Sequence, residues 1–182
     1  GWVPEWTDAN AITLLTKASA SVNGFFYALD SGSGALQKML GDIPGLTALL
    51  SKDKNKILFS RSANNSFETF LYNVKSRTTT PFPVTTLPEK CVWTKDSIIL
   101  YCGAPKLIPA GMYPDLWYQG RISFTDTRWK INTETKTPER LAFPETDAKE
   151  IVDVVEPLVS PNDDFLFFIN KNDSALWSLK LR

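Results

Sequence analysis

The sequence predicts an all-β fold, a β-propeller of four consecutive antiparallel blades that forms part of a larger propeller. Two observations carry this prediction. A polar-turn signature and an aromatic signature each occur four times along the 182 residues, always in the same order. The spacing of the turn signature matches the roughly 40 to 45 residues of a four-stranded propeller blade.

The turn signature is an apolar residue followed by Ser or Thr, a short polar turn and a run of strand-forming residues. Its apolar and hydroxyl positions are Trp6-Thr7, Leu50-Ser51, Trp93-Thr94 and Val159-Ser160. Successive hydroxyl residues lie 44, 43 and 66 positions apart. The longer third interval indicates an insertion in the third repeat.

The aromatic signature places an aromatic residue two positions before an aliphatic one, near the end of each repeat. The aromatics are Tyr27, Tyr72, Trp129 and Trp177, and the aliphatics are Leu29, Val74, Ile131 and Leu179. Equal placement in every repeat predicts that these aromatics pack in the core, with sugar stacking as the alternative. Alternating runs rich in β-branched and aromatic residues separate the turns and predict strands. An unrelated β-sandwich is the alternative fold, but a sandwich has no reason to repeat one turn at this interval.

The repeats place the four blades at residues 1–44, 45–87, 88–148 and 149–182. The last blade stops after its third strand, and closed propellers commonly complete such a blade with a strand from elsewhere because an open edge exposes backbone groups. We therefore expect the open ends to be covered by a second copy, as a homodimer, or by upstream blades. A compact four-bladed ring is the alternative.

Three segments carry a resemblance to a known family. The run "LVSPNDDFLFFINKNDSALWSLKL" resembles the WD40-like PD40 repeat of TolB-type propellers, in which a Ser-Pro-Asp-Gly turn joins two strands. The runs "LPEKCVWTKDSIILYC" and "YPDLWYQGRISFTD" resemble the C-terminal propeller regions of uncharacterised proteins from candidate-phyla, Patescibacteria-like bacteria. The turn glycine is absent from every repeat, and one repeat retains the proline.

The resemblance implies an extracytoplasmic propeller at the cell surface. In the full-length proteins of that family a membrane segment upstream of the propeller supplies the tether, so any membrane contact would come through a segment that this chain lacks. The family brings no catalytic residues to transfer to this sequence.

Composition excludes several classes of function. Lys+Arg and Asp+Glu both number 20, for a formal net charge of zero, and no stretch concentrates basic residues. Binding to nucleic acid therefore has no electrostatic support. The chain has no histidine, which removes the most common metal ligand and general base. We expect no cofactor, no metal site and no catalytic constellation.

The only two cysteines, Cys91 and Cys102, flank a Lys-Asp-Ser break between two apolar runs. If Asp96-Ser97 forms a two-residue turn, the cysteines stand directly opposite each other in a hairpin. Such pairs have Cβ atoms about 4.5 to 5.5 Å apart, close to the separation a disulfide needs. The spacing predicts a disulfide across the hairpin, and two reduced core cysteines are the alternative.

The insertion of the third repeat, residues 106–127, combines four large aromatic or sulfur-containing side chains with Pro and Gly. Long loops on a rigid scaffold often carry function, and Tyr and Trp are typical of binding hot spots. The candidate binding residues are Met112, Tyr113, Trp117, Tyr118 and Arg121, with Asp115, Asp126 and Arg128 at the rim. The alternative is a structural strap that folds over a neighbouring blade and buries its own rings.

These observations favour a non-enzymatic, extracytoplasmic binding or scaffold propeller that mediates protein or glycan interactions. The alternative is the propeller portion of a glycan- or peptide-active hydrolase, with carboxylates at the central mouth. Glu68, Glu89 and Asp126 lie near predicted strand ends, but the sequence defines no pair among them. The acidic run at residues 145–153 is interpreted as a solvated connection between blades.

Overall fold

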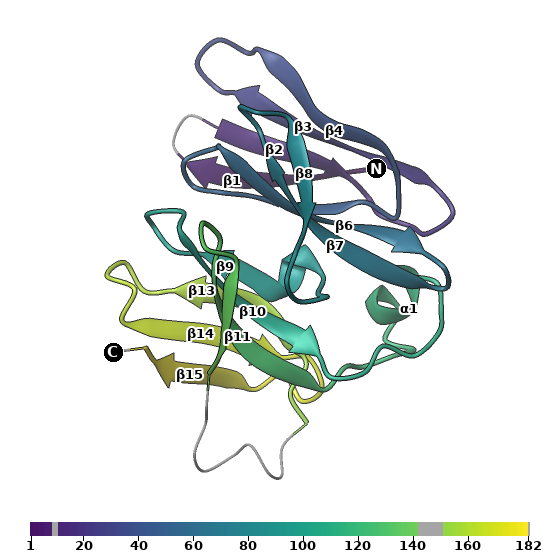
Figure 1. The fold of residues 1–182 in the computed structure, drawn as a ribbon. Coiled ribbons are helices and arrows are strands. Elements are labelled where there is room, and N and C mark those ends of the chain that lie inside the picture. Colours follow the sequence, from purple (N-terminus) through teal and green to yellow (C-terminus); the bar gives the residue numbers. More distant parts are fainter. Residues whose placement is uncertain (9–10, 142–150, 182) are drawn as a thin grey trace.

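The computed structural model describes residues 1–8, 11–141 and 151–181, and four antiparallel sheets build its fold (Figure 1). The predicted four-bladed propeller arrangement is confirmed. Blade 1 contains β1 (Trp2–Asp8), β2 (Ala11–Thr16), β3 (Asn23–Asp30) and β4 (Leu36–Pro44). Blade 2 contains β5 (Thr47–Leu50), β6 (Lys56–Ala63), β7 (Ser66–Asn73) and β8 (Thr78–Pro81). In both blades the strands pair in sequence order, as a meander.

The other two blades repeat this order. Blade 3 contains β9 (Cys91–Trp93), β10 (Ile99–Pro105), β11 (Asp126–Asn132) and β12 (Thr137–Arg140). Blade 4 contains β13 (Val154–Val159), β14 (Phe165–Asn170) and β15 (Leu176–Lys180). The described helices are the 3-10 turn η1 (Pro88–Lys90) and α1 (Asp115–Tyr118). Neither is long enough to cross a membrane.

The hydroxyl of the turn signature has a definite structural role. The Ser51 Oγ accepts a hydrogen bond from the backbone N–H of Lys56 at 2.9 Å. Thr94 accepts in the same way from Ile99 at 3.1 Å, and Ser160 accepts from Phe165 at 3.0 Å. In three blades, therefore, a side-chain oxygen closes the turn between the first and second strands, as Ser and Thr commonly do in turns.

The blades pack face to face, and an apolar cluster fills each contact between neighbours. The cluster between blades 1 and 2 contains Phe26, Leu46, Leu50, Ile57 and Phe59. The next contains Leu58, Phe82, Cys91, Trp93, Leu100, Cys102 and Ile131, and the third contains Tyr101, Val152, Val154, Leu166 and Phe168. Of the signature aromatics, Tyr72, Trp129 and Trp177 pack against these clusters, as core packing predicts.

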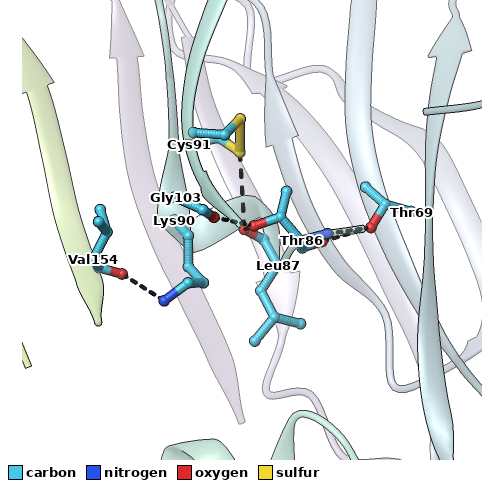
Figure 2. Close-up of a disulfide and its surroundings, with 8 residues drawn as sticks. Thr69, Thr86, Leu87, Lys90, Cys91, Gly103 and Val154 are labelled. Carbon is cyan, nitrogen blue, oxygen red and sulfur yellow. Dashed lines mark hydrogen bonds between the residues drawn. A yellow bond between two sulfur atoms is a disulfide. The ribbon is translucent and has the colours of Figure 1, made fainter. Parts of the chain in front are cut away.

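The disulfide predicted between Cys91 and Cys102 is present. The two residues are direct partners in the β9–β10 pairing, with Cα atoms 4.1 Å apart, and both are buried between blades 2 and 3. Figure 2 shows the bridge above Leu87, whose carbonyl oxygen lies 4.0 Å from the Cys91 sulfur. Beside it, the Thr86 hydroxyl donates to the Gly103 carbonyl at 2.5 Å (Figure 2). The bridge therefore joins the first two strands of blade 3 within the core.

Candidate functional site: the central channel

The first strand of each blade lies at the centre of the propeller, and together these strands surround a cavity of about 350 Å³, here called the channel cavity. Its lining comes from β1, β2, β5, η1, β9 and β13. Much of the wall is apolar, with Leu49, Val92 and Pro157 from three different blades. Carboxylates of Glu5, Glu89 and Glu156 also line it. The cavity thus exists only because the four blades assemble.

A second cavity of about 340 Å³, here called the Tyr118 cavity, adjoins the first. The two share four lining residues, Glu5, Thr13, Ala48 and Glu89. The Tyr118 cavity extends toward the end of β2 and toward α1, where Lys17 and Tyr118 line it. Glu89 therefore stands between two connected hollows along the centre of the molecule.

Glu89 has one satisfied carboxylate oxygen and one free one. The Tyr118 hydroxyl donates a hydrogen bond to Oε1 of Glu89. Oε2 is buried and has no hydrogen-bond partner in the part of the chain that the structure describes. Burial raises the pKa of Glu89, and the hydrogen bond from Tyr118 opposes that rise. A buried acceptor without a partner is costly, so a ligand donor would be stabilised at this position.

The hydroxyl of Tyr118 remains a donor over the whole ordinary pH range. Although 42% of the Tyr118 residue is exposed, burial around its hydroxyl, and then the negative charge of Glu89, raise the pKa of Tyr118 above its usual value. The pair accordingly consists of a neutral phenol and a carboxyl group whose second oxygen is buried without a partner among the described residues.

The insertion spans one end of the channel and begins by joining blades 1 and 2. The Asp115 carboxylate accepts a hydrogen bond from the backbone N–H of Ala20, after β2, at 2.7 Å. The backbone N–H of Gly111 donates to the Asn65 carbonyl in the β6–β7 turn at 2.7 Å. In Figure 1, α1 lies beside the ends of these blades.

The same insertion also reaches blade 4. The indole N–H of Trp117 lies 3.1 and 3.0 Å from the two carboxylate oxygens of Asp153. The backbone N–H of Phe124 donates to Asp153 at 3.0 Å, and Lys171 in the β14–β15 turn donates to the Trp117 carbonyl. These contacts make the insertion a strap across the end of the propeller.

The predicted binding residues fall into two groups. Tyr113 and Trp117 are 0% and 4% exposed, in a cluster with Phe67 and Phe124, which matches the strap alternative. The other three, Met112, Tyr118 and Arg121, are exposed. Of the five, Tyr118 is the residue that lines a cavity shared with the channel. Met112 lines a separate hollow of about 300 Å³ beside the β6–β7 turn.

A buried ion network surrounds Lys90, the last residue of η1. The ammonium of Lys90 is 2.8 Å from the Asp126 carboxylate and also contacts Asp153, and all three side chains are fully buried. Lys90 also donates to the Val154 carbonyl at 3.0 Å, as Figure 2 shows. Burial raises the pKa of Asp126 to about 6, with Lys90 opposing the rise.

This network corrects three expectations drawn from the sequence. Asp126 and Arg128 do not rim a binding loop, because both are buried at the start of β11. Asp153 is not a solvated link between blades, because it is fully buried and holds three separate segments together. Residues 145–150 of the same acidic run lie outside the described residues. The sequence did not identify Lys90 as part of a buried network, because its partners Asp126 and Asp153 are distant in the chain.

The candidate carboxylates of a hydrolase do not meet in one place. Glu68 forms an exposed ion pair with Arg61 at 2.8 Å, and Asp126 pairs with Lys90. Glu89 alone of the three lines the channel cavity. Within the described ranges, no group of three or more acidic or cysteine side chains is placed to hold a metal ion. The channel cavity combines apolar walls with the carboxylates of Glu5, Glu89 and Glu156.

No protein-family model matches the chain, and no curated protein matches it. Solved structures do match it over nearly its whole length. TolB from Acinetobacter baumannii is 14% identical, with a TM-score of 0.63 over 97% of this chain and 42% of that protein. The β-propeller domain of the Trilobed protease from Pyrococcus furiosus is 14% identical, with a TM-score of 0.55 over 98% of this chain and 56% of that domain's chain. The acylaminoacyl peptidase of Pyrococcus horikoshii is 17% identical, with a TM-score of 0.56 over 99% of this chain and 32% of the peptidase.

These similarities show the fold. The chain is a β-propeller region that resembles TolB-like and peptidase propellers and matches parts of larger propellers. It spans 42%, 56% and 32% of the lengths of the three proteins named above. The TolB-type resemblance expected from the sequence is thus supported at the level of three-dimensional structure.

Proposed function

We propose that this chain is a non-enzymatic binding propeller outside the cytoplasm that takes a segment of a protein or a glycan into its central channel. The observation that carries the proposal is the channel cavity of about 350 Å³, lined by the first strands of all four blades. Ligand sites are typically concave, mostly apolar and supplied with a few polar groups that fix orientation. The channel cavity has this composition.

The polar groups of the cavity favour a ligand that donates hydrogen bonds. Glu89 presents a buried carboxylate oxygen without a partner, and Glu5 and Glu156 line the same cavity. Amide, hydroxyl and ammonium groups would satisfy these acceptors, and apolar parts of the ligand would contact Leu49 and Val92. Peptides and glycans both carry such donors beside apolar surface.

The extracytoplasmic location rests on the disulfide. A bridge between Cys91 and Cys102 persists in oxidising compartments and is rare in the cytosol. The resemblance of the repeats to TolB-type propellers supports the same location. The alternative is that the chain is the propeller portion of a hydrolase. Its support is the similarity to peptidase propellers, which is a similarity of fold.

A binding screen tests this proposal. Short peptides and oligosaccharides are screened by the rise in melting temperature, since a ligand that binds the folded state raises it. Each compound that binds is then titrated against Glu89→Gln and against Glu68→Gln, a surface carboxylate outside the channel. We expect Glu89→Gln to weaken binding about tenfold, the loss of roughly one charged hydrogen bond, and Glu68→Gln to leave it unchanged.

Two outcomes would contradict the proposal. Equal binding by Glu89→Gln and the wild type would move the site away from the channel. Turnover of a peptide or glycan by the wild type that is abolished in Glu89→Gln would establish the hydrolase alternative.

A further inference from the structure

The lining of the two central cavities is unevenly charged. Among the described residues, the charged side chains that line the channel cavity are Glu5, Glu89, Glu156 and Lys52. Glu5 and Glu89 also line the Tyr118 cavity, together with Lys17. The strands β1 and β13 and the turn η1 thus bring three carboxylates to one hollow, although the formal charges of the whole chain cancel.

A bulge in β13 places Glu156 at the channel cavity. The pairing of β13 with β14 shifts register between Val155 and Leu158, and Glu156 between them has a φ of +50°. A bulge of this kind re-aims side chains relative to a regular strand. Glu156 and the following Pro157 both line the channel cavity. The irregular part of β13 therefore forms part of the cavity wall.

Two buried polar atoms of residues on the channel wall have no hydrogen-bond partner among the described residues. One is the acceptor Oε2 of Glu89, and the other is the indole N–H of Trp93, a donor. Trp93 is only 1% exposed, and both residues line the channel cavity. Buried polar groups are almost always hydrogen-bonded, and an unpaired one is costly. A ligand that offers both a donor and an acceptor would remove this cost.

The Tyr118 cavity adds an apolar compartment next to these polar atoms. Its volume of about 340 Å³ lies within the range of cavities that hold small-molecule ligands. Because the two cavities share Glu5 and Glu89, an apolar group in one would lie beside a group that contacts the carboxylates in the other. The apolar residues of the Tyr118 cavity are Val3, Leu15, Ala18, Phe26 and Ala48.

We propose that the ligand of the channel is a peptide segment that carries a Lys or Arg side chain next to an apolar one. The ammonium or guanidinium group lies among the carboxylates of Glu5, Glu89 and Glu156, and the apolar side chain fills the Tyr118 cavity. This inference rests on the proposed function, because it specifies the ligand of the same site.

The composition of the two cavities favours a peptide over a glycan. Each peptide group carries one N–H donor and one C=O acceptor, which match the unpaired atoms of Glu89 and Trp93. A neutral glycan brings no cation to the carboxylates, and an acidic glycan is repelled by them. An amino sugar supplies an ammonium group but no aliphatic or aromatic side chain for the Tyr118 cavity.

A positional-scanning peptide library tests the inference on the full chain. Each pool of tetrapeptides fixes one residue type at one position, and acetyl and amide groups remove the terminal charges. Binding is measured as the rise in melting temperature. Pools with a fixed Lys or Arg should give the largest rise, and pools with a fixed Asp or Glu the smallest. Among Lys pools, a neighbouring Leu or Phe should increase the rise relative to Gly or Ser. Chitotriose and its fully deacetylated form are measured in parallel as a neutral and a cationic glycan.

A charge-neutral variant then tests the contact with the cation. A Lys tetrapeptide from the best pool, and the same peptide with Gln in place of Lys, are titrated by calorimetry. Glu156→Gln should weaken the Lys peptide about two- to fivefold, as expected for a partly exposed ion pair, and leave the Gln peptide unchanged. Glu134→Gln, at an exposed carboxylate that lines neither cavity, is the matched control and should affect neither peptide. Both residues are exposed, so both variants should melt at the wild-type temperature.

Three results would overturn this inference and leave the channel as a binding site. The first is that neutral or acidic pools bind as tightly as basic ones and lose affinity in Glu89→Gln. The second is that a glycan binds more tightly than every peptide pool and loses affinity in Glu89→Gln. The third is that Glu156→Gln affects the Lys and Gln peptides equally. If no pool and no glycan binds, or if Glu89→Gln binds every compound as the wild type does, the proposed function fails and this inference fails with it.

Discussion

Lys90 and Asp153 lie 63 residues apart in the chain, yet the lysine ammonium contacts the carboxylate at a site where both side chains are fully buried. Asp153 also accepts hydrogen bonds from Trp117 and Phe124 of the insertion. One carboxylate thereby connects η1, the strap and the start of blade 4. Glu89, which lines the channel cavity, precedes Lys90 on the same turn.

Replacing Lys90 with Met should destabilise the chain by about 3 to 5 kcal/mol, since removing one partner of a buried ion network leaves uncompensated charge. Urea unfolding, followed by tryptophan fluorescence, measures the loss. Lys130→Met is the control, because Lys130 and Glu139 form a partly exposed pair at 3.4 Å. The control should cost at most about 1 kcal/mol. Equal losses in the two variants would show that the network contributes little.

The carboxyl group of Asp126 should make stability fall as the pH rises from about 4 to about 6. Its pKa is about 6 in the folded chain, raised by burial, and near 3.9 in an unfolded one. Between these pH values the folded state retains a proton that the unfolded state has released, so raising the pH favours unfolding. Above about pH 6 the contribution of Asp126 is constant.

The variant Asp126→Asn isolates this effect, because an amide does not titrate. The free energy of unfolding of both proteins is measured with urea at intervals from pH 4 to pH 8. Between about pH 4 and about pH 6, the value for the wild type should fall relative to the value for Asp126→Asn. A difference that is constant with pH, or that moves in favour of the wild type, would contradict the raised pKa. Other carboxylates titrate in both proteins, so their effect on stability cancels in the difference. One is Asp53, where burial raises the pKa but hydrogen bonds from Ser51 and Asn55 lower it further.

The disulfide should add about 2 to 3 kcal/mol, the loop-entropy value for a short closed loop. Intact mass spectrometry of unreduced protein should show the loss of two hydrogens, and dithiothreitol should lower the urea midpoint. In the double variant Cys91→Ala with Cys102→Ala, the reductant should have no effect. Two freely alkylated thiols in unreduced protein would contradict the bridge.

The two neighbouring aromatics of α1 should respond differently to substitution. Trp117→Phe removes the N–H that binds the buried Asp153 carboxylate and should cost about 1 to 3 kcal/mol. Tyr118→Phe removes the one hydrogen bond from Tyr118 to Glu89, from a residue that is 42% exposed, and should cost about 0.5 to 1.5 kcal/mol. Urea unfolding measures both. A larger loss for Tyr118→Phe would mean that Tyr118, and not Trp117, anchors the strap.

The blades were predictable from the sequence because the Ser or Thr of the turn signature makes a hydrogen bond within its own turn. The hydroxyls of Ser51, Thr94 and Ser160 each close the turn between the first two strands of a blade, so the signature returns with every blade. The disulfide was predictable for a similar reason. Cys91 and Cys102 belong to one hairpin, and a hairpin register follows from its turn.

The channel and the ion network were beyond such reasoning because they join residues from different repeats. Lys90 and Asp153 occupy no repeated position, and their contact follows from how blades 3 and 4 pack around the insertion. Aromatic density in the insertion was a sound signal, but it could not separate the buried Trp117 from the exposed Tyr118. The sequence singled out Glu89 as a carboxylate near a predicted strand end. Its position between two cavities was not predictable, because residues from all four blades form the channel cavity.

The most direct test of the channel as the binding site is to fill it. Ala48 lines both central cavities, and Ala48→Phe would place a ring between them. Ala35→Phe, the same change at an exposed position next to β4, is the control. The variants are first compared by melting temperature, to confirm that both are folded.

The measurement is a calorimetric titration of the tightest ligand from the peptide and glycan screen. We predict that Ala48→Phe lowers its affinity by about a hundredfold or more, equivalent to roughly 3 kcal/mol, while Ala35→Phe binds as the wild type does. Wild-type affinity in a folded Ala48→Phe variant would contradict the central channel as the site of ligand binding.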